Sequence, residues 1–147
     1  MNFFKTILPN LPEYRRLDKH IDNNYLPIGV TGVSAVHKAH LITSLCMNKN
    51  KKAFVIASNE PEAYKFVNDF TAMGCRAFLY PVRDYTFRDI EGQSSEYTHN
   101  RLEVLANITY GLFDVIVFCI DAAMQLTIPK DMLEVNTLEL RAQDDIT

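Results

Sequence analysis

Three short apolar runs constrain the fold of this chain more than any other feature of its sequence. They cover residues 53–57, 75–80 and 115–120. The first and last of these are continuously apolar, which is typical of parallel strands with both faces buried. Segments with helical spacing of apolar residues separate the runs. We therefore predict an α/β domain with a parallel sheet flanked by helices and joined by right-handed crossovers.

The helices are predicted from their caps and their apolar spacing. Asn59 is a suitable N-cap, with Glu62 at the third following position and Gly74 as the C-terminal stop. The predicted helices cover residues 11–22, a segment from Ser34 onward, residues 60–73 and a segment from about Ser95 onward. The last of these is expected to turn a face of leucine and isoleucine inward: Leu102, Leu105, Ile108 and Leu112.

The turn before the second helix resembles a phosphate-binding loop that has lost its chemistry. Residues 27–30 are predicted to form a short strand, and Gly29 and Gly32 then give the segment the look of such a loop. The working pattern ends in Gly-Lys followed by Ser or Thr, because the lysine neutralises phosphate and the hydroxyl holds magnesium. Here Ser34, Ala35 and Val36 occupy those positions. We predict a tight turn that binds no cofactor, with weak phosphate binding at the helix N-terminus as the alternative.

Other candidates for chemistry are weaker. Asp121 follows the last apolar run, where nucleotide hydrolases place a metal-holding aspartate, but an N-cap is the favoured interpretation. His37 and His40 lie three residues apart without a carboxylate at a matching ligand position. No Ser-His-Asp or Cys-His set is evident. The sequence therefore predicts no catalytic residue and no metal site in this chain.

Four charged residues are candidates for an interface. Arg83 and Arg88 lie among aromatic residues in a polar loop over residues 81–94, which favours a packed loop or protein interface over contact with DNA bases. Glu96 is expected in the first turn of a helix, where its charge suits the dipole. Arg101 follows about a turn later and could pair with a neighbouring domain, with a solvated helix face as the alternative.

Composition places this sequence among ordinary soluble proteins. The 147 residues carry a net charge of −3, so binding to nucleic acid by charge alone is not expected. No apolar run is long enough to span a bilayer. Three cysteines, far apart and in apolar surroundings, indicate buried thiols in a reducing compartment, so we expect a cytoplasmic protein without membrane contact.

The end of the sequence departs from the pattern of the rest. Residues 133–140 are predicted to be a half-exposed strand, which is an unusual way to finish a domain. We therefore expect one α/β domain over residues 1–130. Residues 131–147 are then the truncated start of a connection to a following domain.

Several motifs, in their order and spacing, resemble the N-terminal domain of bacterial transcription-repair coupling factors. They are Gly29-Val30-Thr31-Gly32 with Ser34-Ala35, residues 53–63, Leu79-Tyr80-Pro81, Ser95-Glu96 with Arg101-Leu102 and Leu105, Val115-Ile116-Val117, and residues 126–129. The resemblance covers residues 10–135. It implies a P-loop NTPase-like fold, similar to the first domain (1a) of the repair protein UvrB and related to RecA, with a degenerate nucleotide loop.

The resemblance also implies a function for a longer protein. Such a protein is an ATP-driven DNA translocase that displaces stalled RNA polymerase at lesions and recruits nucleotide-excision repair. This piece would scaffold the UvrA-binding region and contact later domains, with a share in autoinhibition. ATP, magnesium and double-stranded DNA would then be bound by the motor, and UvrA and RNA polymerase by other parts. The alternatives are a UvrB-like DNA-binding fragment and a small nucleotide- or phosphate-binding α/β enzyme domain.

Overall fold

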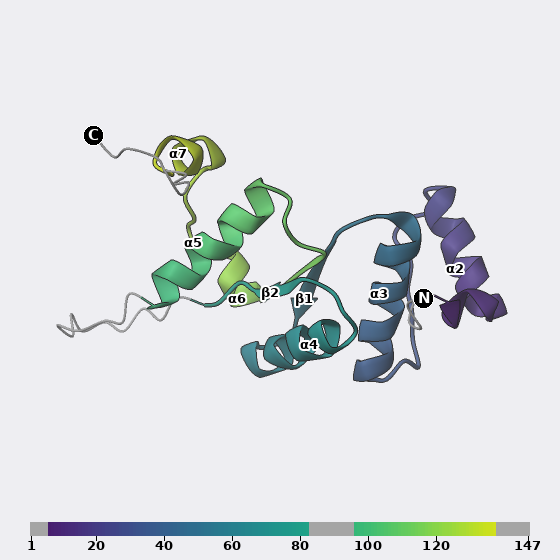
Figure 1. The fold of residues 1–147 in the computed structure, drawn as a ribbon. Helices are drawn as coiled ribbons and strands as arrows, with labels where there is room; N and C mark the ends of the chain where they lie inside the picture. Colours follow the sequence, from purple (N-terminus) through teal and green to yellow (C-terminus); the bar gives the residue numbers. More distant parts are fainter. Residues whose placement is uncertain (1–5, 83–95, 138–147) are drawn as a thin grey trace.

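The computed structural model describes residues 6–82 and 96–137. It confirms the α/β class, with a parallel sheet flanked by helices (Figure 1). In chain order the elements are η1 (Leu8–Asn10), α2 (Pro12–Asp22), α3 (Ala35–Lys49), β1 (Ala53–Ala57), α4 (Glu60–Ala72), β2 (Ala77–Leu79), α5 (Glu96–Thr109), β3 (Val115–Cys119), α6 (Ile120–Ala123) and α7 (Lys130–Val135).

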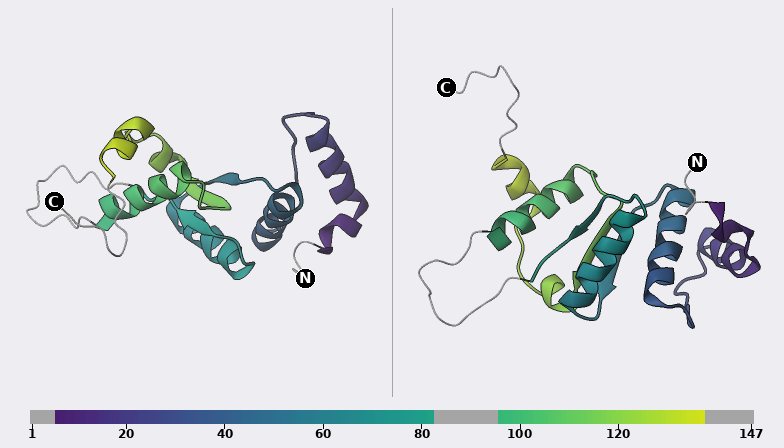
Figure 2. Two further views of the ribbon diagram at one scale, coloured as in Figure 1. Left: turned by 45° about the horizontal axis from the view of Figure 1, so that its top comes forward. Right: turned by 60° about the horizontal axis from the view of Figure 1, so that its bottom comes forward.

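The sheet is organised around its last strand. Its order is β1-β3-β2, and β3 pairs in parallel with both neighbours. Val115 and Val117 face a core shared with α4, and Ile116 faces a second core that contains Val104 of α5. The strands therefore lie between α4 and α5, while α3 lies beside α4 and α2 lies beyond α3 (Figures 1 and 2).

Helix α4 forms as the sequence predicts. The Glu62 N–H donates to Asn59 Oδ1 at 2.9 Å, so Asn59 is the N-cap. The Glu62 carboxylate accepts hydrogen bonds from the Ser58 hydroxyl and from the Ser58 N–H, and these lower the pKa of Glu62. Gly74, with φ of +86°, ends the helix in the conformation that favours glycine.

The α5 side of the sheet differs from the prediction in two ways. Leu102 and Leu112 are exposed, because α5 turns Arg101 and Val104 inward instead. Phe54 and Ile56 of β1 are 57% and 64% exposed, since α5 covers β3 and β2 and does not reach across the edge strand. The expectation that 53–57 is buried on both faces was therefore wrong.

Residues 27–30 do not form a strand, although the sequence predicted one. Pro27 has no N–H to donate, and glycine weakens a strand, so Pro27 and Gly29 both disfavour a place in a sheet ladder. The segment instead leads from α2 to α3 without sheet pairing. A strand before the glycine turn, which a phosphate-binding loop requires, is thus absent from the described residues.

Two other expectations are corrected towards the end of the chain. Residues 133–135 belong to helix α7, where Lys130 and Glu134 form an ion pair one turn apart, and not to a strand. Asp121 is not an N-cap, because α6 begins at Ile120 with Cys119 as its N-cap. Residues 138–140 lie outside the described part, and the domain boundary at 130 stays a prediction.

The cysteines are buried free thiols, as the sequence predicts. Burial raises the pKa of Cys46 to about 11 and also raises that of Cys75. The Cys75 thiol, just before β2, lies 3.6 Å from Thr43 Oγ1 of α3. This contact connects the start of β2 to α3. Within the described ranges, no helix is long and apolar enough to cross a membrane.

An ion pair joins the amino ends of β2 and β3. Asp114 accepts hydrogen bonds from the Arg76 N–H at 2.8 Å and from the Arg76 guanidinium at 3.0 and 3.3 Å. The guanidinium hydrogen bonds, with the backbone one, hold the pKa of Asp114 below its ordinary value. The pair therefore ties the edge strand β2 to the central strand where both begin.

This ion pair predicts how stability depends on pH. Because the folded state lowers the Asp114 pKa, its contribution is present above the pKa of the unfolded chain and is lost as pH falls through the lower, folded value. We expect Asp114→Asn to reduce the loss of stability between pH 5 and pH 2, relative to the unsubstituted chain. Urea unfolding across that range measures it. Equal acid-side slopes would contradict the assignment, and Asp131→Asn on α7 is the control.

Candidate functional site

A cleft of about 990 Å³ lies at the N-terminal side of the molecule. Its walls are η1 and α2, the segment over residues 28–33, and the first half of α3. Apolar side chains from all three walls line it, including Leu11, Ile28, Val33 and Leu41. The degenerate loop that the sequence singled out therefore borders a cleft and not a sheet.

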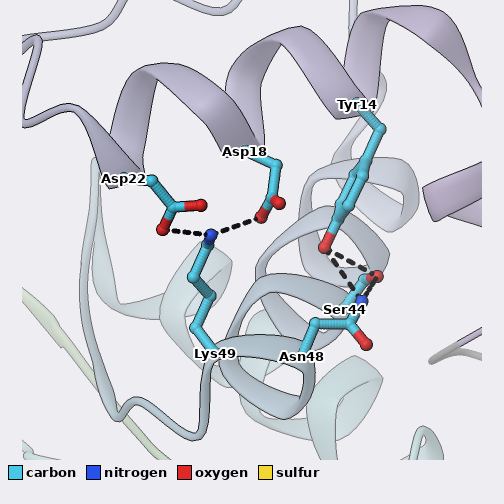
Figure 3. A network of polar contacts seen from close by, with 6 residues as sticks. All are labelled: Tyr14, Asp18, Asp22, Ser44, Asn48 and Lys49. Carbon is cyan, nitrogen blue, oxygen red and sulfur yellow. Dashed lines mark hydrogen bonds and ion pairs between the residues drawn. The ribbon is translucent and has the colours of Figure 1, made fainter.

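A polar network attaches α2 to α3 next to this cleft, and one of its residues, Tyr14, also lines the cleft (Figure 3). The hydroxyl of Tyr14, a buried residue, accepts a hydrogen bond from Ser44 at 3.2 Å and one from Asn48 at 3.0 Å. Asn48 also donates to Ser44 at 3.2 Å. Buried hydroxyls need such partners, so the contact holds Tyr14 in one position against α3.

Ion pairs extend this attachment to the end of α3. Lys49 lies 2.8 Å from Asp18 and 2.6 Å from Asp22, which follow each other by one turn of α2 (Figure 3). The hydrogen bonds to both carboxylates raise the pKa of Lys49. The two helices are thus fixed at the second half of α3, while the cleft lies between them at the first half.

The degenerate loop has none of the groups that hold a nucleotide. Ser34 is the N-cap of α3, and its hydroxyl lies 2.9 Å from Nδ1 of His37 instead of capping a backbone N–H. Ala35 and Val36 begin the helix, so no lysine or hydroxyl stands at the positions where phosphate and magnesium need them. Gly32 has a φ of +74°, a conformation that favours glycine, and its role here is limited to forming the turn.

Three histidines line the cleft. His20 comes from α2, and His37 and His40 come from one side of α3. Their convergence depends on the way α2 folds back along α3, which helical spacing within α3 alone does not reveal. Among the described residues, no group of three metal-ligating side chains is close enough to hold a metal ion.

A second cluster lies at the carboxyl ends of the strands, around Arg101. This side chain is 7% exposed and donates to the Pro81 carbonyl and to Gln125 Oε1, each at 2.8 Å. Its guanidinium carbon lies 4.1 Å from the ring centre of Tyr80. The Tyr80 hydroxyl in turn donates a hydrogen bond to Thr127 Oγ1. Arg101 thus makes internal contacts between α5, the end of β2 and the segment after α6, and its pairing with a neighbouring domain stays untested.

The remaining interface candidates are not brought together with this cluster. Arg83 and Arg88 lie outside the described residues. Glu96 is the first residue of α5, and its side chain is also outside the description. The sequence analysis missed the role of Tyr80, although it placed this aromatic residue at the end of the predicted strand over residues 75–80.

Comparison with known proteins gives one informative match. The chain is 24% identical over 119 residues to the transcription-repair-coupling factor of Bacillus subtilis. The match covers 80% of this chain but 10% of that protein, so the chain spans about a tenth of the length of its relative. No protein-family profile and no solved structure matches the chain. The similarity suggests a link to the coupling factors.

The Arg101 cluster yields a prediction about stability. Arg101→Met keeps much of the apolar bulk but leaves the Pro81 carbonyl and the Gln125 side chain without this donor. We expect a loss of about 2–4 kcal/mol in the free energy of unfolding, the range for breaking a buried, charge-assisted contact. Urea unfolding measures it, with Lys65→Met on the exposed side of α4 as the control. If the two variants were equally stable, the contact would be energetically unimportant.

Proposed function

We propose that this chain is a non-catalytic domain of a transcription-repair coupling factor. The observation that carries the proposal is the similarity to the Bacillus subtilis protein, which spans 80% of this chain. The substitutions at the degenerate loop agree with a domain that has no chemistry of its own. A parallel sheet between helices is also the architecture that such a role would use.

The proposed role is that of a scaffold within a longer protein. The domain supports the region that binds UvrA and contacts the motor, which it helps to hold in an inactive state. ATP, magnesium, double-stranded DNA and RNA polymerase are engaged by other parts of that protein. The exposed apolar face of β1, with Phe54 and Ile56, offers a surface for such intramolecular contacts.

The gene itself provides the first test of this proposal. We expect the reading frame to continue past the codon for Thr147 into a motor domain with an intact Gly-Lys-Thr or Gly-Lys-Ser loop and a downstream acidic box. Sequencing the genomic locus checks this. A stop codon directly after that position would contradict membership in a translocase and leave a resemblance of fold.

Nucleotide binding provides the second test. We expect isothermal titration of the chain with ATP and magnesium to show no saturable binding at millimolar nucleotide, because Ala35 and Val36 replace the groups that hold phosphate and metal. The double variant Ala35→Lys, Val36→Thr is a matched comparison that restores those side chains. Saturable binding by the unsubstituted chain that Gly32→Val abolished would contradict the proposal and favour a nucleotide-binding enzyme domain.

A further inference from the structure

We propose that the cleft between α2 and α3 is a binding site for a small organic anion with an apolar or aromatic body. This goes beyond the scaffolding role, since a scaffold needs no ligand at this position. It does not depend on the coupling-factor assignment, because every observation behind it concerns side chains of this chain. Size, walls and polar groups each point to the same class of ligand.

The size and lining of the cleft match those of small-molecule sites. Its volume of about 990 Å³ lies at the upper end of the range of ligand pockets, roughly 300–1,000 Å³. Leu17, Ile28 and Val33 present apolar surface from all sides, as in pockets that bury most of a ligand. An apolar or aromatic group that binds here would be transferred from water to an apolar protein surface.

Polar contacts attach one wall of the cleft, α2, to the second half of α3. The Tyr14 hydroxyl and the Lys49 ion pairs fix α2 against the second half of α3. Along the third wall, a Cβ built on Gly29 or Gly32 would meet no atom within 4 Å. The backbone of this segment is therefore open to close approach by a ligand.

The polar groups of the cleft include one guanidinium, three imidazoles and one carboxylate. Arg16 lines it and forms no ion pair with any described residue. The imidazoles of His20, His37 and His40 also line it, and α3 contains no aspartate or glutamate. Glu13 is the one carboxylate of the lining, and it lies on the same helix as Arg16. Arg16 therefore offers a guanidinium that forms no ion pair with a described carboxylate, which suits a single anionic group.

The residues at the start of α3 argue against a triphosphate as the ligand. Three phosphates need a lysine and a metal ion to offset their charge, and the loop offers Ala35 and Val36 instead. One carboxylate, sulfonate or phosphate monoester requires far less compensation, which Arg16 supplies. The site is thus expected to prefer a monoanion with a large apolar body over a nucleotide.

Three ligands with the same ring system and different charge test this preference. They are naphthalene-2-sulfonate, 2-naphthalenemethanol and 2-naphthylmethylammonium, titrated into the isotopically labelled 147-residue chain and followed by NMR. We expect the sulfonate to bind at least tenfold more tightly than the ammonium, with shifts at Val33 and Leu41. Equal affinities, no binding at millimolar ligand, or shifts centred on Phe54 and Ile56 of the sheet would overturn the proposal.

Charge reversal at the rim identifies the group that selects the anion. Arg16→Glu is expected to weaken sulfonate binding at least fivefold while changing binding of the neutral alcohol less than twofold. Lys19→Glu, on the same helix but outside the lining, is the matched control and should leave both affinities unchanged. If Arg16→Glu and Lys19→Glu acted alike, the preference would reflect the overall field of α2 and the assigned site would be wrong.

A substitution in the apolar wall tests where the ring system lies. Val30 is 49% exposed, so Val30→Glu is expected to keep the fold, as circular dichroism verifies, and to weaken binding of the sulfonate and of the neutral alcohol. Val135→Glu on α7, at the opposite end of the molecule, is the control (Figure 1). Self-association of the chain that Val30→Glu abolished would show that a second copy fills the cleft, and would overturn a small-molecule site.

Discussion

The burial of strand β3 is the constraint on which the rest of this structure depends. Val115, Ile116 and Val117 are almost completely removed from solvent, and each such side chain contributes about 1.5–3 kcal/mol when buried. The strand pairs on both edges, so β1 and β2 join the sheet through it and are not paired with each other. Helices α4 and α5 pack against the two faces of this strand.

The N-terminal part is attached by a different kind of interaction. Helix α3 joins the core through apolar side chains such as Ala39 and by the contact of Thr43 with Met73. Helix α2 reaches α3 by the polar network of Tyr14 and the ion pairs of Lys49. Exposed ion pairs contribute little, so the buried hydroxyl network is the stronger part of this attachment. The fold can therefore hold a wide space between two helices without filling it.

The sequence predicted those elements whose signals are local. The capping of α4 by Asn59, its stop at Gly74 and the apolar run of β3 depend on neighbouring residues, and all three are confirmed. The predicted inner face of α5 was wrong at Leu102, because Arg101 and Val104 take the inward positions, whereas Ile108 packs against the core as predicted. The partners of Arg101, which are Pro81 and Gln125, are distant in sequence. Apolar periodicity cannot anticipate such a residue.

The same distinction explains what could be predicted of the candidate site. The substitution of lysine by Ala35 is visible by comparing a few adjacent positions with a pattern, so the absence of a working phosphate loop could be read directly. The cleft could not be predicted, because its walls come from residues far apart in the sequence and depend on the attachment of Tyr14 to α3. A phosphate loop needs a strand to fix its glycines, whereas a cleft needs its walls attached to one another. Residues 28–41 meet the second requirement and not the first, so a segment that resembles a nucleotide loop in sequence can border a site of another kind.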